Sequence, residues 1–205
     1  MVMRRPVADV NTVLYGGAFR GRSVGDQLSA KDWLDQGLRT LAKHGFTALK
    51  AEPLAKAMGV SRGSFYWHFA DIGAFHRAIL EHWRDVAVER IIADIEALSP
   101  DANALSALLN RAFGGKPPVL ESAMRSWAAH DPVARSVVQA VDQRRMGYIE
   151  KLLRDAGLPL EVARARTQIL YWAFLGFALS DGPPSRTRQA AILRELLRVT
   201  SHDRR

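Results

Sequence analysis

The 205-residue sequence contains no cysteine. This absence excludes disulfide scaffolds, thiol nucleophiles, iron–sulfur clusters and cysteine-based zinc sites. The six histidines include no pair at i,i+4 spacing and no H-E-x-x-H motif, which are the usual helical spacings for metal ligands. We therefore expect neither a cofactor nor a metal site.

Long hydrophobic runs are also missing. The longest, residues 169–179, has eleven residues, whereas a transmembrane helix needs about 20. Near the N-terminus, Asp9 and Asn11 interrupt the segment in which the apolar part of a signal peptide would lie. These features predict a cytoplasmic protein with no membrane partner.

Acidic residues are fewer than basic ones. The chain has 29 Lys and Arg against 21 Asp and Glu, which gives a formal net charge of +8. An excess of positive charge favours polyanionic partners, and nucleic acid is the first of these.

Strand patterns are absent, because no β-branched run alternates over four to eight residues. Helix signals recur instead. Ser29 and Asp32 resemble a capping box, and Ser61 and Asp71 are expected to cap later helices. The sequence therefore predicts an all-α fold, with helices in the second half near residues 101–113, 120–129, 132–156, 160–180 and 185–201.

The most informative segment is residues 54–69. It has the pattern of a short helix, a tight turn at Gly59, and a second helix that begins after Ser61. This is the helix-turn-helix arrangement, whose second helix enters the major groove of DNA by its N-terminal end. At that end Arg62 can bind guanine, and Gly63 permits close approach to a base.

The same segment resembles the TetR (tetracycline-repressor) family of bacterial transcriptional regulators. The matching residues are Leu54-Ala55, Gly59-Val60-Ser61 and Ser64-Phe65-Tyr66-Trp67-His68-Phe69. The resemblance is strong over residues 30–85 and weaker over residues 120–180. It implies that Tyr66 and His68 contact DNA phosphates and that Lys50 lies near the start of the positioning helix.

The candidate DNA-binding residues are Lys50, Ser61, Arg62, Gly63, Ser64, Tyr66, Trp67 and His68. The alternative for Arg62, Tyr66 and His68 is an ordinary polar surface. Phe65, Trp67 and Phe69 are expected mainly in the core of the head. Relatives usually carry Lys at the second residue of the next helix, where this chain has Ile72, so we expect no phosphate contact at that position.

Three parts of the chain follow from these patterns: an N-terminal arm over residues 1–28, expected to be flexible, a helix-turn-helix DNA-binding domain over residues 29–85, and a helical ligand-binding and dimerisation domain over residues 86–205. Residues 169–179 are apolar nearly all round, which predicts burial on two sides. The predicted dimer interface comprises Ala173, Gly176, Ser180, Ile192, Leu193, Leu196 and Leu197. The candidate ligand pocket comprises Phe113, Met124, Trp127, Tyr148, Tyr171 and Trp172.

The sequence is thus interpreted as a homodimeric repressor that a small-molecule effector releases from a palindromic double-stranded DNA operator. One alternative is a helix-turn-helix regulator that has no small-molecule input and answers to a protein partner. A remote alternative is an α/β-hydrolase, because Gly59-Val60-Ser61-Arg62-Gly63 matches the G-x-S-x-G motif. That motif requires a strand before the serine, whereas a helix is expected there, so we do not expect an enzyme.

Overall fold

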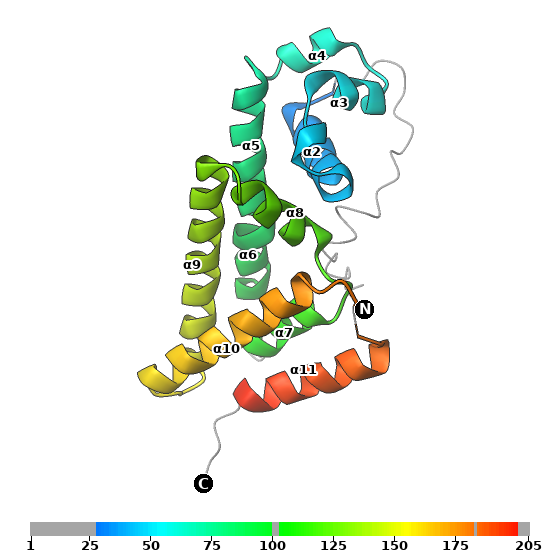
Figure 1. Ribbon diagram of the computed structural model, residues 1–205. Helices are drawn as coiled ribbons and strands as arrows, with labels where there is room; N and C mark the ends of the chain where they lie inside the picture. The colour runs from blue at the N-terminus through cyan, green and yellow to red at the C-terminus, as the bar shows by residue number, and fades with distance from the viewer. Residues whose placement is uncertain (1–27, 100–102, 183, 201–205) are drawn as a thin grey trace, which may run out of the picture. The chain divides into compact units, whose positions relative to one another are not determined.

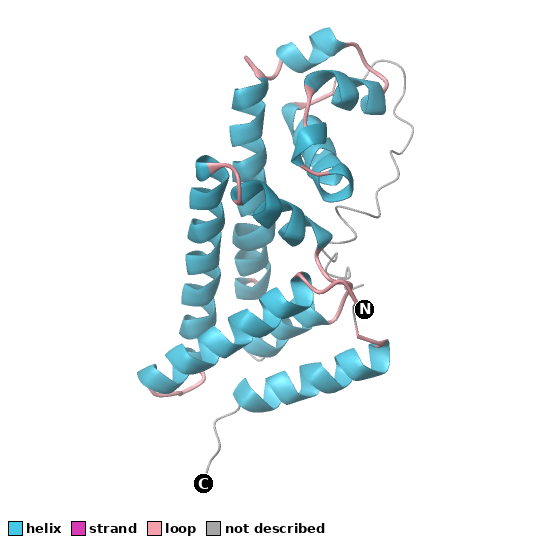
Figure 2. Ribbon diagram, viewed as in Figure 1, coloured by secondary structure: helices cyan, strands magenta, loops and turns pink. Residues whose placement is uncertain are grey.

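The computed structural model describes residues 28–99, 103–182 and 184–200. Within these ranges the chain forms helices and loops and no strand (Figure 2). The all-α prediction is therefore confirmed. The described helices, drawn in Figure 1, fall into two compact units that divide between Trp83 and Arg84. Nearly all of the expected N-terminal arm lies outside the described residues.

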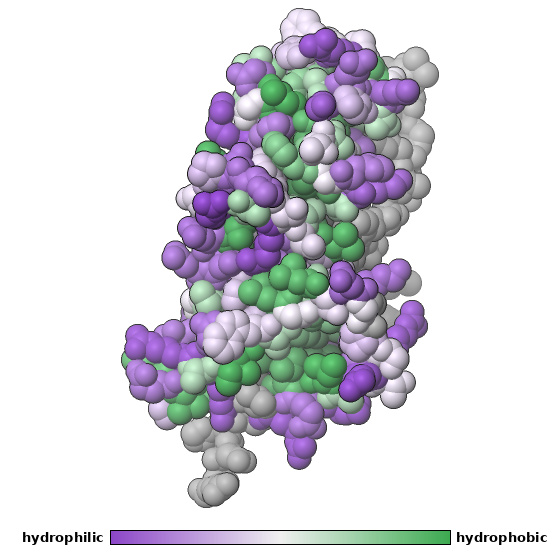
Figure 3. All heavy atoms as spheres, in the orientation of Figure 1, coloured by the Kyte–Doolittle hydropathy of each residue, from purple (hydrophilic) through white to green (hydrophobic). Residues whose placement is uncertain are grey.

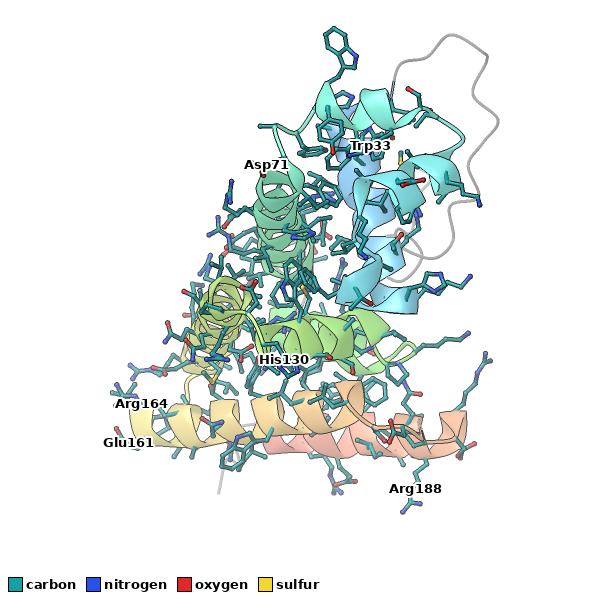
Figure 4. All side chains as sticks on the ribbon, turned by 45° about the horizontal axis from the view of Figure 1, so that its top comes forward. Trp33, Asp71, His130, Glu161, Arg164 and Arg188 are labelled. Carbon is teal, nitrogen blue, oxygen red and sulfur yellow. The ribbon has the colours of Figure 1, made fainter. Side chains whose placement is uncertain are left out.

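The described part of the first unit contains five helical elements: α2 (Ala30–His44), the 3-10 turn η1 (Phe46–Ala48), α3 (Ala51–Met58), α4 (Arg62–Tyr66) and α5 (Ile72–Arg84). Two predicted caps begin the longer helices. In the capping box of α2, the amide of Ser29 donates to Asp32 Oδ2 at 2.8 Å. At the start of α5, where Figure 4 labels Asp71, the amide of Ala74 donates to Asp71 Oδ1 at 2.6 Å.

The turn between α3 and α4 follows the prediction in part. Gly59 ends α3 in the left-handed conformation, with φ 69° and ψ 28°, which favours glycine. Ser61 precedes α4 as expected, but its hydroxyl makes no capping hydrogen bond. The helix ends at Tyr66, three residues earlier than the sequence indicates.

Aromatic side chains form the core of the first unit. Phe65 of α4 lies at its centre, with ring-centroid distances of 5.4 Å to Trp33 of α2 and 5.2 Å to Phe75 of α5. All three side chains are fully buried. Because Phe65 contacts both longer helices, the core fixes the position of α4 within this unit.

Gly37 allows α2 to approach α5 closely. A Cβ atom at this position would lie 2.3 Å from Ile79 Cδ1 and 2.8 Å from Phe75 Cζ.

We therefore expect Gly37→Ala to lower the free energy of unfolding by about 1–3 kcal/mol in urea denaturation, since overpacking outweighs the better helix propensity of alanine. As a control, Gly147→Ala in a later helix meets nothing within 4 Å and should stabilise by about 1 kcal/mol. Equal effects of the two substitutions would contradict this packing.

A hydrogen bond between Asp35 and His82 also joins α2 to α5. The carboxylate of Asp35 accepts a hydrogen bond from His82 Nε2 at 2.6 Å and also pairs with Lys31. Burial acts to raise the pKa of Asp35, but the bonds from His82 and Lys31 outweigh it and lower the pKa from 3.8 to about 2.

A lowered pKa means that ionised Asp35 stabilises the folded state at neutral pH. This contribution, about 2 kcal/mol, should be lost as the pH falls from about 4 to about 2. Urea unfolding of the wild type and of Asp35→Asn at a series of pH values checks this. The difference in stability between them should shrink over that interval, and a constant difference would show that Asp35 is not responsible.

The second unit begins with the π-helical turn η2 (Asp85–Glu89), which precedes α6 (Arg90–Glu96). The helices that follow agree closely with the predicted segments. They are α7 (Ala104–Phe113), α8 (Val119–Ala128), α9 (Pro132–Asp155), α10 (Leu160–Ala178) and α11 (Arg186–Thr200). The helix α9 packs against α8 and α10, while α7 packs against α11.

Helix α10 is buried on one side within the single chain. Leu170 and Tyr171 face the core, and burial of the second side, expected at the dimer interface, stays a prediction. On the other side Ile169 is 50% exposed and Trp172 is 64% exposed. Figure 3 shows hydrophobic side chains gathered over α10 and α11. An apolar helix face of this kind is unusual for a surface that stays in water.

Candidate nucleic-acid interface and groove

The α4 segment combines buried phenylalanine side chains with exposed polar and aromatic side chains. Phe65 and Phe69, four residues apart, are both buried. Phe69 lies three residues beyond the end of α4, and its ring centroid is 5.3 Å from that of Phe65, so the two rings pack together in the core. Tyr66 is 44% exposed and Trp67 is 88% exposed.

The expectation for the aromatic residues is therefore confirmed for Phe65 and Phe69 and wrong for Trp67. Trp67 lies just after the last residue of α4 and is exposed to solvent. A fully exposed indole cannot serve the core, but it adds a large apolar group to the surface at the end of α4.

The structure brings most of the candidate DNA-binding residues to one short segment. Arg62, Gly63, Tyr66, Trp67 and His68 are exposed on α4 or just after it. Ser61 is exposed immediately before α4, and Ser64 is half-buried within it. Lys50 is exposed at the residue before α3, as the resemblance implied. Ile72 is the first residue of α5 and is 36% exposed.

Two of these side chains are in direct contact. The guanidinium Nη2 of Arg62 donates a hydrogen bond to the hydroxyl of Tyr66 at 3.1 Å. The guanidinium carbon lies 5.5 Å from the centroid of the Tyr66 ring, within the range of a cation–π interaction. The hydrogen bond to Tyr66 raises the pKa of Arg62, so the cation is stabilised in this position.

The hydrolase alternative fails on this geometry. Ser61 follows α3 and its turn instead of a strand, and the described part of the chain has no strand from which a hydrolase sheet could be built. The downstream Asp131 caps α9 by accepting a hydrogen bond from the amide of Ala134 at 2.9 Å. The match to G-x-S-x-G therefore has no catalytic meaning in this fold.

A groove of about 560 Å³ opens in the second unit, between the ends of α7 and α10 and the start of α11. Its wall is mainly apolar and includes Phe113, Phe177 and Ile192, with Ser180 and Arg188 among its polar residues. Figure 4 shows Arg188 pointing away from α11. The side chain of Gln189 closes one end, where its amide donates to the carbonyl oxygens of Phe113 and of Gly115.

The groove combines parts of two predicted sites. It contains Phe113 of the candidate ligand pocket, and Ala173, Gly176, Ser180 and Ile192 of the predicted dimer interface. Gly176, Ser180 and Ile192 are exposed, while Leu193, Leu196 and Leu197 are half-buried along α11. The ligand and dimer roles of these residues stay predictions.

The other candidate pocket residues do not line this groove. Met124, Trp127, Tyr148 and Tyr171 are buried in the core of the second unit, whereas Trp172 faces solvent. Large apolar and aromatic residues at helical spacing are more often core than pocket, and these four follow that tendency.

A network of buried charges in the same core was missed by sequence reasoning. Glu121 of α8 is 2% exposed and binds two arginines, with 2.8 Å between its Oε1 and Arg125 Nη2 and 2.9 Å between its Oε2 and Arg145 Nη1. Arg125 also binds Asp142 at 2.7 Å, and the hydroxyl of Tyr171 donates to Asp142 at 2.5 Å. The network thereby joins α8, α9 and α10. The Glu121–Arg125 spacing of i,i+4 was a visible signal, but the pairing between helices was not.

The described residues hold no group of three or more His, Asp or Glu side chains that could bind a metal ion. None of the described helices has the length and hydropathy needed to cross a membrane.

Comparison with known proteins agrees with this architecture. Residues 34–79 match the family model described as bacterial regulatory proteins, tetR family. Among proteins of curated function, none matches the chain in sequence.

Solved structures share the fold over most of the chain. A transcriptional regulator from Saccharomonospora viridis in complex with choline has a TM-score of 0.64 at 14% identity, covering 82% of this chain and 95% of the other. A TetR-family transcriptional regulator from Rhodococcus sp. has a TM-score of 0.60 at 18% identity, covering 84% and 98%. A member of the TetR family from Streptomyces coelicolor A3 has a TM-score of 0.58 at 23% identity, covering 82% and 98%.

The family match covers the helix-turn-helix and the helices around it, and the solved structures extend the shared fold through the second unit. Regulators of this family are DNA-binding proteins and not enzymes. Residues 34–79 therefore match the TetR family of bacterial transcriptional regulators, and the chain shares its fold with solved structures of that family.

Proposed function

We propose that this protein is a homodimeric repressor that leaves its operator when a small molecule binds the second unit. The observation that carries the proposal is the exposed surface of α4, where Arg62, Tyr66, Trp67 and His68 face solvent. Arginine can form a bidentate contact with guanine, while tyrosine and histidine suit phosphate oxygens. These residue types allow one short helix both to orient on DNA and to read a base pair.

The exposed apolar face of α10 and α11 supports the homodimer. Ile169, Trp172 and Ile192 are 50%, 64% and 41% exposed in the single chain. A second copy of the chain would cover this face from both subunits in a symmetric interface. Two heads held at a fixed separation would read a palindromic operator whose half-sites lie about 34–36 Å apart.

The groove supports regulation by a small molecule. Its volume of about 560 Å³ lies within the range of small-molecule sites, and its mainly apolar wall suits a largely apolar effector. The related protein from Saccharomonospora viridis carries choline. Because the groove includes Gly176 and Ile192, an effector there would lie beside the proposed interface, where it could favour a head spacing that mismatches the operator.

Genomic footprinting of the full-length protein, repeated with candidate effectors, tests the proposal. We expect protection of palindromic sites, and loss of that protection with one class of largely apolar compound. Protected sites that no small molecule releases would favour the regulator controlled by a protein partner. The absence of sequence-specific protection would reject DNA-binding regulation altogether.

A further inference from the structure

We infer that Tyr66 is a positioning residue, whose hydroxyl holds the Arg62 guanidinium in place to read one base pair of each half-site. The inference rests on the proposed binding to DNA and assigns a second role to a side chain otherwise expected to touch only phosphate. It follows from the one contact between side chains on the exposed surface of α4, the hydrogen bond of 3.1 Å from Arg62 to Tyr66.

The two residues occupy the first and last positions of α4, one helical turn apart. A side chain at i+4 lies directly beside one at i, so the pair forms without any distortion of the helix. The guanidinium both donates to the hydroxyl and lies over the ring, at 5.5 Å from its centroid. These two contacts restrict the guanidinium in distance and in orientation.

The Tyr66 ring is itself held by the core. Its centroid lies 5.3 Å from that of the buried Phe65, with the planes at 84°, in an edge-to-face contact. Phe65 in turn contacts Trp33 and Phe75. A series of ring contacts therefore runs from the core of the first unit to an arginine that is otherwise fully exposed.

Such a restraint matters because a free arginine side chain has many rotamers, and ordering them on DNA reduces affinity. Arginine has five N–H donors in a planar fork, so donating one bond to Tyr66 leaves others for guanine O6 and N7. A guanidinium already held near the tip of α4 should discriminate better between base pairs than an unrestrained one.

Positioning and phosphate binding predict different results for the same substitution. A phosphate contact carries no sequence information, so its loss weakens binding to all sequences alike and lowers the salt dependence. Loss of positioning instead reduces the preference at the base pair that Arg62 reads. The substitution Tyr66→Phe separates the two roles, because it keeps the ring and its contact with Phe65 but removes the hydroxyl.

The test is a double-mutant cycle on the full-length protein with Arg62→Ala, Tyr66→Phe and the double variant. Binding is measured on the selected operator, on its single base-pair variants and on unrelated duplex DNA at several salt concentrations. We expect Tyr66→Phe to reduce discrimination about tenfold at the base pair that Arg62→Ala also affects. Its effect on discrimination at that base pair should vanish in the Arg62→Ala background.

The substitution His68→Gln provides the matched control, since His68 is exposed beside the same helix and should combine additively with Arg62→Ala. An equal loss on every sequence with a reduced salt dependence would overturn positioning and leave only a phosphate contact. A loss of discrimination in Tyr66→Phe that persists without Arg62, or unchanged discrimination in Tyr66→Phe, would also overturn it. A wild-type protein that selects no sequence would instead reject the proposed function itself.

Discussion

Replacing Glu121 by alanine is expected to lower the free energy of unfolding by about 3–5 kcal/mol, the largest effect on stability that we expect of a single substitution. The carboxylate is 2% exposed and lies between the guanidinium groups of Arg125 and Arg145, whose side chains are only 21% and 15% exposed. Removing it leaves two partly buried positive charges beside an unfilled space.

The pKa values of the two arginines follow from this arrangement. Burial acts to lower the pKa of Arg125, but its hydrogen bond to Asp142 and the charge of Glu121 outweigh burial, and the net pKa is raised. Burial likewise acts to lower the pKa of Arg145, and the charge of Glu121 raises it. Without Glu121 the desolvation of both cations stays while an opposing anion is gone, which is why breaking a buried pair costs more than the pair contributes in isolation.

Chemical denaturation with far-ultraviolet circular dichroism measures this effect. The matched control is Glu161→Ala, which removes a carboxylate 3.1 Å from Arg164 at the exposed start of α10 (Figure 4). Since that pair is 83% and 57% exposed, its loss should change the free energy of unfolding by less than about 1 kcal/mol. Similar losses for the two variants would mean that Glu121 is hydrated in solution.

Gly176→Leu is expected to convert the protein to a monomer and to weaken operator binding by at least about 100-fold, the gain that linking two binding modules typically gives. Gly176 is exposed, and a Cβ there would meet nothing within 4 Å in the single chain. Leucine is also a better helix former than glycine. The substitution therefore places no strain on the monomer, and its bulk obstructs a partner packed on α10 as well as the groove that Gly176 lines.

Sedimentation velocity, circular dichroism and operator titration test this expectation together. The matched control is Gly147→Leu, which changes an exposed glycine of α9 that also has nothing within 4 Å, away from the proposed interface. It should stay dimeric with normal operator binding. If Gly176→Leu behaves in the same way, then the dimer forms through another surface.

Local signals in the sequence predicted local structure well. The capping box at Ser29, the cap at Asp71 and the left-handed Gly59 each depend on a few neighbouring residues, so their patterns determine their geometry. The proline and glycine residues between the helices of the second unit predicted where those helices begin and end. The resemblance identified the α4 segment, and the structure places its polar residues on the surface.

Features that depend on contacts between distant residues were not predictable in this way. Trp67 was expected in the core because it stands between two core phenylalanines, but it follows the last residue of α4 and is 88% exposed. The apolar character of residues 169–179 suggested burial on two sides, since a sequence does not distinguish the core of one chain from a surface covered by another. The Glu121 network joins residues up to 50 positions apart, from Glu121 to Tyr171.

Helix α11 differs from the other long helices in that none of its described side chains is buried. In an isolated chain its amide hydrogens should therefore exchange with solvent through local opening that leaves the rest of the unit folded. Association on the α10 and α11 face would raise the free energy of that opening, so exchange protection of α11 would increase with protein concentration. At low cellular concentration the helix would open often enough to be accessible to proteases, which would link the lifetime of the regulator to its own abundance.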